Sequence, residues 1–193
     1  MRLRCRAAAA VLSAGIVLAG CTGTDAVDQN AGNDFRFHSA NSRGSLIKVS
    51  DRKPAADFGA SLLNGGTYRL SQDTGKVVIV NFWATWCGPC TVETPQFNNI
   101  YNAYKAKGAT FVGVDTKETT RDAPKAFVKD NGIDFPIVYD EQGETAVRLG
   151  NIPTGGMPFT VVVDRSRRVA AVYVGPVAPK DLEPVLDKLV AER

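Results

Sequence analysis

Histidine and cysteine are scarce in this sequence, which limits the kinds of site that the chain can build. The 193 residues include one histidine, His38, and four cysteines. Zinc sites in proteins are built mainly from several such ligands. A four-ligand zinc site within one chain is therefore implausible, and we expect no metal and no separate cofactor.

Long apolar runs are also missing. The longest, from Ala7 to Ala19, is too short to span a bilayer comfortably. Arg2, Arg4 and Arg6 precede it, and a basic segment followed by a short apolar one is typical of an export signal. We therefore predict that residues 1–20 are a signal peptide, which takes no part in the fold.

The residues Leu18-Ala19-Gly20-Cys21 resemble the lipobox of bacterial lipoproteins, whose cysteine is lipidated and becomes the first residue of the mature chain. The resemblance implies that Cys21 carries a lipid and that Cys5 is removed. Cys87 and Cys90 are then the free thiols that remain. The alternative is a conventional signal that is cleaved nearby and leaves Cys21 as a free thiol.

An excess of charge is missing once the signal is set aside. The whole chain carries a net charge of +3, from 23 Lys and Arg against 20 Asp and Glu, but residues 1–20 hold three arginines and no acid. The mature chain is therefore close to neutral, and its charge does not favour a nucleic-acid partner. Arg165, Arg167 and Arg168 form a small cluster, for which a solvated hairpin tip and a contact with an anionic membrane surface are the alternatives.

The mature chain divides into a tether and one domain. Residues 21–45 are rich in Asn, Asp, Gly, Ser and Thr without hydrophobic periodicity, which predicts a flexible tether, and His38 within it is more simply solvated than catalytic. The domain spans residues 46–193. Its nearly continuous apolar run from Lys76 to Phe82 is typical of a central strand that is covered on both faces.

Helical and strand patterns alternate along the domain, which predicts an α/β sheet with parallel crossovers. The expected strands are 76–82, 110–114, 135–139, 159–163 and 169–174, with a short strand-like piece at 68–70, and the expected helices follow Cys90, cover 122–131 and end the chain around 182–190.

Two cysteines separated by Gly88 and Pro89 lie where the central strand is expected to turn into a helix. The unpaired N–H groups and the dipole of a helix N-terminus favour an anion, so they lower the pKa of the first thiol. Cys87 is therefore the expected attacking thiol. Cys90, about one turn further in, suits a resolving thiol, and Pro89 is tolerated because an early helical N–H has no partner to lose.

The alternatives for this pair are a structural disulfide and half of a metal site. A structural disulfide removes more entropy from the unfolded state when it closes a longer loop. The ring between Cys87 and Cys90 is minimal, so a structural disulfide there would add little stability. A metal site would need further ligands, and the chain offers few histidines and cysteines to supply them. Redox chemistry is the favoured interpretation.

The stretch from Asn81 to Cys90, NFWATWCGPC, resembles the active site of the thioredoxin superfamily, and the domain resembles the extracytoplasmic TlpA and ResA-like thiol-disulfide oxidoreductases. Pro95 and the stretch from Gly156 to Thr160 support this branch. The resemblance implies a thioredoxin-like α/β fold, with a central mixed sheet flanked by helices and an inserted helix and strand between the CxxC helix and the cis-proline strand.

The same resemblance assigns roles beside the cysteines. It implies that Pro158 is a cis proline next to the active site and that the backbone of Met157 pairs with a substrate segment. Trp86 is expected to shield the thiol and contact substrate. The alternatives are an ordinary trans proline at a strand start and a tryptophan that only packs.

One position departs from the thioredoxin pattern. Asn81 stands where many thioredoxins place a buried Asp, and an amide cannot accept the proton of Cys90. By its resemblance to ResA-like proteins, Glu118 is the expected proton relay, with a solvated loop acid as the alternative. We expect Glu93, one turn into the helix, on a solvated face.

These features predict a lipid-anchored, extracytoplasmic enzyme that exchanges its Cys87–Cys90 disulfide with protein thiols at the cell membrane. The ResA-like resemblance implies a reductive task, such as keeping the haem-binding cysteines of apocytochrome c reduced in cytochrome c biogenesis, with electrons from a membrane thiol carrier. The alternative within the same chemistry is an oxidase that forms disulfides in exported proteins.

Two other classes fit less well. A peroxiredoxin-type peroxidase would need a threonine three residues before its attacking cysteine, whereas Thr85 stands two residues before Cys87. A Sco-like copper-binding module would need a wider cysteine spacing and a histidine within the domain.

Overall fold

The computed structural model describes residues 46–150 and 156–192. The predicted signal peptide, the predicted tether and Cys21 lie outside the described residues. Among the described residues, no helix is long and apolar enough to cross a membrane.

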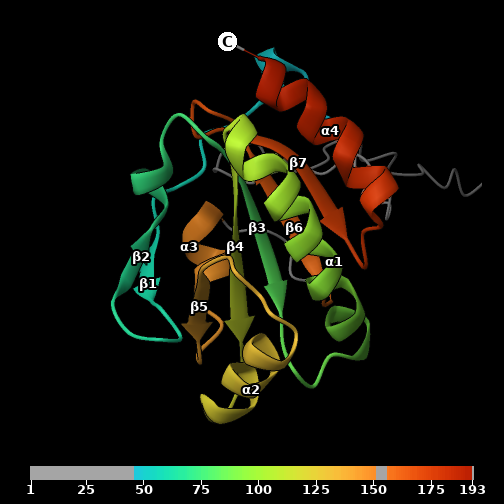
Figure 1. The fold of residues 1–193 in the computed structure, drawn as a ribbon. Coiled ribbons are helices and arrows are strands. Elements are labelled where there is room, and N and C mark those ends of the chain that lie inside the picture. The colour runs from blue at the N-terminus through green and yellow to red at the C-terminus, as the bar shows by residue number, and fades with distance from the viewer. Residues whose placement is uncertain (1–45, 151–155, 193) are drawn as a thin grey trace, which may run out of the picture.

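A five-stranded mixed sheet forms the centre of the domain (Figure 1), in the spatial order β5-β4-β3-β6-β7. The strands β3, β4 and β5 are parallel, β6 runs antiparallel to β3, and β7 runs antiparallel to β6. Their bounds are β3 Val77–Trp83, β4 Ala109–Thr116, β5 Ile137–Asp140, β6 Phe159–Val163 and β7 Val169–Val174. The predicted alternation and the predicted hairpin are confirmed.

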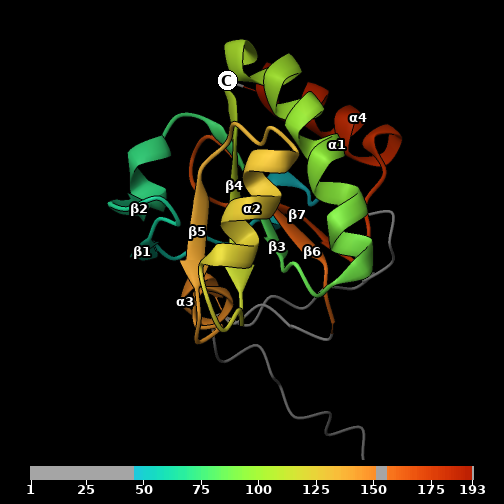
Figure 2. The ribbon, with the colours of Figure 1, turned by 60° about the horizontal axis from the view of Figure 1, so that its bottom comes forward.

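Helices cover both faces of this sheet. They are α1 Gly88–Tyr104, α2 Asp122–Asp130, α3 Thr145–Gly150 and α4 Pro179–Ala191. The helices α1 and α4 lie over one face, and Figure 2 shows α2 beside α1 on the same side. Phe127 of α2 packs into the same apolar cluster as Phe97 of α1 and Leu186 of α4. Helix α3 covers the other face, where Ala146 and Leu149 are buried.

The strand β3 is buried along its whole length, because helices and loops cover it on both sides. Val77, Ile79 and Trp83 belong to the cluster under α1, and Val78 and Val80 belong to the cluster on the opposite face. A strand with two apolar faces needs a continuous apolar run, which explains the sequence pattern at this strand.

The helix α3 and the strand β1 Gly59–Ser61 had no prediction. The helix α3 is only six residues long, and β1 forms a hairpin of three-residue strands with β2 Thr67–Arg69. The hairpin covers the edge of the sheet, because Leu63 donates its N–H to the carbonyl of Ile137 in β5. The strand-like piece predicted at 68–70 corresponds to β2, which lies one residue earlier because Leu70 already begins the 3-10 helix η2 Leu70–Asp73. Two further 3-10 helices, η1 Val49–Asp51 and η3 Lys105–Lys107, complete the fold.

A buried arginine ties the first described segment to the C-terminal end of the domain. Arg52 Nη1 lies 3.1 Å from Asp164 Oδ2 and 2.6 Å from Glu192 Oε2, and its Nε donates to the carbonyl of Ile47. Burial raises the pKa of Asp164, but the backbone N–H of Arg168 and the guanidinium of Arg52 outweigh it and lower the pKa. Hydrogen bonds from Arg52 lower the pKa of Glu192.

We predict that Arg52→Ala lowers the free energy of unfolding by about 3 kcal/mol at pH 7, because it leaves Asp164 buried with one cation fewer. The two acids have depressed folded pKa values, so their contribution is present at neutral pH and is lost as pH falls through those values. The deficit of the variant should therefore shrink below about pH 4. Urea denaturation at pH 7 and pH 3.5 measures both quantities.

The matched control is Arg69→Ala, which removes an exposed ion pair to Asp57 at 3.5 Å. Exposed pairs contribute well under about 1 kcal/mol, so this variant should unfold almost as the unmodified protein does. Equal effects of the two substitutions would contradict the assignment of Arg52 as a buried tie.

Candidate active site

The two cysteines lie at the junction of β3 and α1. Cys87 is the N-cap residue of α1, with φ −93° and ψ 99°, and Gly88 and Pro89 are the first residues inside the helix. Cys87 and Cys90 form a disulfide with a Cα–Cα distance of 5.2 Å. Cys87 is 6% exposed, and Cys90 is fully buried. The first thiol therefore combines the helix N-terminus with access from outside, whereas the second is reached only through the first.

A cavity of about 470 Å³ opens beside Cys87. Its walls are largely apolar and come from β3, α3 and the start of β6; Phe82, Trp86, Ala146, Met157 and Phe159 are among the lining residues. The Met157–Pro158 peptide bond is cis, in agreement with the geometry that the resemblance implied. The structure thus brings Trp86, Met157 and Pro158 to the side of the attacking thiol.

Trp86 lines the same cavity as Cys87, and its role in shielding the thiol stays a prediction. It is 57% exposed, and its indole Nε1 donates to the carbonyl of Lys117 at 3.3 Å. An exposed indole beside a reactive sulfur offers a large apolar surface to an incoming polypeptide.

Glu118 lies in the loop after β4 and is buried, with 7% exposure, so the alternative of a solvated loop acid is wrong. Its Oε1 accepts hydrogen bonds from the backbone N–H and the hydroxyl of Thr85, both at 2.6 Å. The hydroxyl of Tyr139 donates to its carbonyl. The observed contacts of Glu118 therefore hold the turn two residues before Cys87, and its role as a relay for Cys90 stays a prediction.

Glu93 was expected on a solvated face, and that expectation is wrong. It is 3% exposed, because its side of α1 packs against β3 and the segment before α4. Its Oε2 accepts from Asn81 Nδ2 at 3.0 Å, and its Oε1 accepts from the backbone N–H of Val177 at 2.6 Å. Burial raises the pKa of Glu93 to about 7, although the two hydrogen bonds oppose the shift.

A signal for Glu93 was present in the sequence. It follows Cys90 by three residues and precedes Phe97 by four, and helical residues at these spacings share one face. Since Cys90 and Phe97 are both buried, the acid between them is buried too. The structure therefore places a carboxyl group one helical turn from the resolving thiol.

Asn81 connects Glu93 to the sheet. The side chain is fully buried, and its Nδ2 donates both to Glu93 and to Thr160 Oγ1 at 3.1 Å. Among the residues that the structure describes, its Oδ1 has no hydrogen-bond partner. The amide can therefore present N–H to a charged Glu93 or, after rotation, its oxygen to a protonated one.

A further buried acid, Asp115, was not predicted. It is the backbone partner of Trp83 in the parallel pair and is fully buried, and no group in residues 46–150 or 156–192 donates a hydrogen bond to either of its carboxylate oxygens. Burial raises its pKa to about 8, and the nearby charges of Glu118 and Asp140 add to the shift. Asp115 follows an apolar strand in the sequence, and an acid at that place could have been predicted as a candidate for the site.

Within residues 46–150 and 156–192, no group of three or more His, Cys, Asp or Glu side chains could hold a metal ion.

The chain is similar to known proteins over most of its length. A family model described as Redoxin matches residues 48–189. A thiol-disulfide oxidoreductase ResA from Bacillus thuringiensis subsp. konkukian is 35% identical over 142 residues, which cover 74% of this chain and 80% of that protein. A ResA protein from Geobacillus kaustophilus is also 35% identical, over 70% of this chain and 75% of its own length.

Solved structures give the same picture. A secreted thiol-disulfide isomerase from Corynebacterium glutamicum superimposes with a TM-score of 0.76 at 35% identity, covering 82% of this chain and 99% of the other. A DsbF homologue from Corynebacterium diphtheriae reaches a TM-score of 0.74 at 31% identity, covering 80% and 99%.

We predict that the carboxyl group of Glu93 titrates near pH 7, where carbon NMR of a labelled side chain can follow it. An acid whose pKa is raised from 4.5 to about 7 on folding stabilises the protein at low pH and loses that contribution as pH rises through 7. Between pH 4.5 and pH 7 the unfolding free energy of the unmodified protein should therefore fall relative to that of Glu93→Gln, by about 3 kcal/mol.

Glu93→Gln is the reference for the unmodified protein in this comparison, because the glutamine amide keeps the shape of the glutamate side chain and cannot ionise. A carboxyl group that titrates near 4.5, or two stability curves that stay parallel over this range, would contradict the assignment.

Proposed function

Since the chain belongs to the redoxin family and is a thiol-disulfide oxidoreductase with a thioredoxin-like fold, we propose that it reduces disulfides in proteins outside the cytoplasm. The observation that carries the proposal is the asymmetry of the cysteine pair. Cys87 faces a largely apolar cavity next to the cis bond before Pro158, and Cys90 is buried one turn from Glu93.

The exchange begins from the reduced pair. The Cys87 thiolate attacks one sulfur of a substrate disulfide, forms a mixed disulfide and releases the other sulfur as a thiolate, which takes a proton from water. The helix N-terminus lowers the free energy of the Cys87 anion. Cys90 then gives its proton to a carboxylate and attacks Cys87 Sγ, which releases the second substrate thiolate and leaves the enzyme as its disulfide.

Glu93 is the acid that the contacts support as proton acceptor for Cys90. It lies on the same helical face, it is shielded from water, and a carboxyl group with a pKa near 7 can exchange a proton at neutral pH. Asn81 suits both states of that acid through rotation of its amide. Glu118, the relay predicted from the sequence, is the competing candidate, and its described hydrogen bonds go to Thr85 and Tyr139.

A reductive role is the finer part of the proposal. ResA relatives and the Gly88-Pro89 dipeptide, which is shared with thioredoxin, support reduction. Proteins with haem-binding cysteines, such as apocytochrome c, are the proposed substrates, and a membrane thiol carrier is the proposed electron donor. Lipid attachment at Cys21 would keep the enzyme at the membrane.

A second candidate comes from one relative. The Corynebacterium glutamicum protein is named a secreted thiol-disulfide isomerase. The second candidate function, which uses the same thiol-disulfide exchange, is the formation of disulfides in exported proteins. The reduction potential of the pair separates the two directions.

We predict a reduction potential for Cys87–Cys90 near that of thioredoxin, roughly −270 mV, or lower, in equilibrium with a dithiothreitol buffer. A peptide with a Cys-x-x-Cys-His disulfide should then be reduced by the dithiol form of the enzyme. A potential near roughly −120 mV, the range of DsbA, would instead assign disulfide formation.

We predict that Glu93→Gln slows resolution of the mixed disulfide by at least about 100-fold at pH 7, since general base catalysis commonly contributes that much. The variant should also lose the rise in rate centred near pH 7, because the group that titrates there is gone. Stopped-flow measurement of substrate release across pH 5 to 9 gives both quantities.

Glu118→Gln is the matched comparison, because it removes the other candidate carboxylate without changing size. We expect it to alter the rate while the inflection near pH 7 stays. If the inflection disappears in Glu118→Gln and survives in Glu93→Gln, the relay is Glu118.

A further inference from the structure

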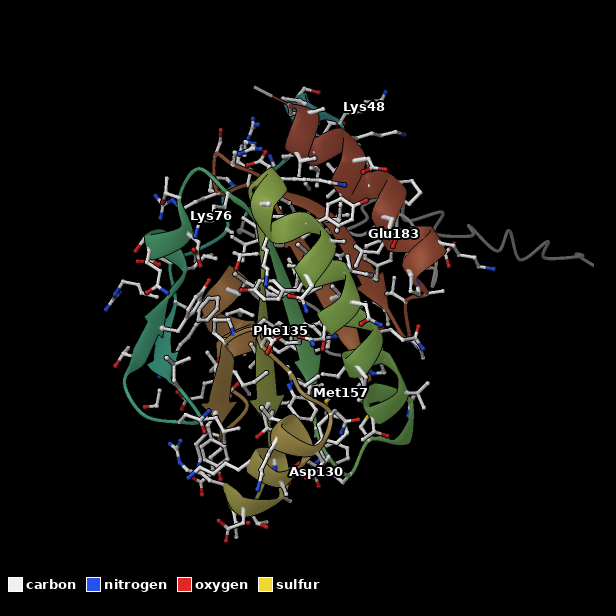
Figure 3. All side chains as sticks on the ribbon, in the orientation of Figure 1. Lys48, Lys76, Asp130, Phe135, Met157 and Glu183 are labelled. Carbon is white, nitrogen blue, oxygen red and sulfur yellow. A yellow bond between two sulfur atoms is a disulfide. The ribbon has the colours of Figure 1, made fainter. Side chains whose placement is uncertain are left out.

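Positive charge is concentrated at the end of the domain that lies opposite the cysteines. Four turns and the last described residue meet there: segments 48–54, 73–76, 105–108 and 164–168, with residue 192. We call this set of segments the basic end. In Figure 3, Lys48 and Lys76 lie toward the end of the molecule where α4 terminates, and Asp130 and Met157 lie toward the other.

Hydrogen bonds join these segments into one surface. Arg165, in the turn between β6 and β7, donates to the carbonyls of Gly75, Lys107 and Val190. The carbonyl of Arg167 accepts from Ala55, and that of Lys53 accepts from Val169. The cations are therefore fixed relative to one another through the backbone.

The count of charges shows how uneven the distribution is. The described residues contain 17 Lys and Arg and 17 Asp and Glu, so the described part of the chain is neutral. The basic end contains nine of the cations and four of the acids, a net charge of +5. The remainder, with the active-site edge, carries the opposite charge.

Three of the four acids at the basic end are already engaged. Asp164 and Glu192 bind Arg52, and Asp73 binds Lys76 at 2.9 Å. Five cations of the basic end form no ion pair within the described ranges, and most of these five are exposed. They are Lys48, Lys53, Lys105, Lys107 and Arg167. The charge of this surface is thus available to a partner outside the domain.

The chain enters the described domain on the same surface. Leu46 is the first described residue, and Arg52 fixes the following segment beside Glu192. The 45 residues before Leu46 include the apolar run and Cys21, which the sequence assigns to export and lipid attachment. A membrane attachment through this segment would therefore meet the basic end first.

We propose that the basic end binds an anionic phospholipid surface and directs the active-site edge away from it. Clustered lysines and arginines next to a membrane attachment are attracted by acidic headgroups over about one Debye length, roughly 10 Å. The strand β3 begins directly after Lys76 at this end and leads toward Cys87 at the other, and its seven residues span about 20 Å at the usual rise per residue. Docking therefore holds Cys87 outside the headgroup layer, open to protein substrates in the aqueous phase.

Lysine acetylation of the full chain on vesicles tests this orientation, because every lysine lies in the described part of the chain. The protein is attached to vesicles of phosphatidylcholine alone or with phosphatidylglycerol, and the rate at each lysine is read by mass spectrometry. Phosphatidylglycerol should slow the labelling of Lys76, Lys105 and Lys107 at least threefold, and 0.5 M NaCl should abolish the difference. Lys125 and Lys129, exposed on α2, should label at the same rate on both lipids.

Charge reversal supplies the matched variants. Lys48→Glu with Lys53→Glu should remove the protection of Lys76 and Lys107, whereas Lys125→Glu with Lys129→Glu should leave it in place. Equal labelling of both ends on phosphatidylglycerol, or protection that is the same on both lipids, would overturn the proposal. Protection by soluble polyglutamate but not by phosphatidylglycerol would also overturn it and would assign the surface to an acidic protein partner.

Discussion

The parallel pairing of β3 with β4 is the constraint on which the active site depends. The register runs from Val77 opposite Ala109 to Trp83 opposite Asp115, so both strands end at the same edge of the sheet. The loops that follow are then forced together. Glu118 reaches Thr85, and the carbonyl of Lys117 reaches the indole of Trp86, which fixes the turn in front of Cys87. The strand β3 is buried on both faces and ends at this edge. The helix α1 begins there, with Cys87 as its N-cap residue, so the unpaired N–H groups of the helix lie next to the thiol.

Three carboxyl groups lie buried at or near that edge, and each has a different environment. Glu118 accepts two hydrogen bonds from Thr85, and Glu93 accepts one from Asn81 and one from Val177. The carboxyl group of Asp115 has no hydrogen-bond partner in the part of the chain that the structure describes. Burying an acid is costly unless it is paired, and the raised pKa values of Glu93 and Asp115 reflect that cost. Such groups are concentrated at functional sites, because a carboxyl group that is half ionised near neutral pH can move protons. Of the three acids, Glu93 is the one that lies one helical turn from Cys90 on α1.

The two ends of the sheet have different tasks. At the end where β3 and β4 finish, apolar surface and buried acids surround the disulfide. At the end where they begin, arginines tie turns to one another and exposed lysines face the solvent. The antiparallel β6 and β7 add their own turn to the second end, which brings Arg165, Arg167 and Arg168 next to the start of the domain. One neutral domain is thus divided into a catalytic end and a basic end by strand direction alone.

By itself, the sequence determined the order of the main elements, the redox pair and the class of fold, because these follow from local patterns. The apolar run before Cys87, the alternation of helix and strand and the CxxC motif need only neighbouring residues to be recognised. Short elements such as β1 and α3 were missed, since their stability comes from packing on the sheet and not from their own periodicity. The environments of the two candidate acids were decided by tertiary structure. The packing of α1 on β3 buries Glu93. The meeting of two loops brings Glu118 to Thr85. Burial and long-range contact set the pKa of an acid, and neither is a property of the residues next to it in the chain.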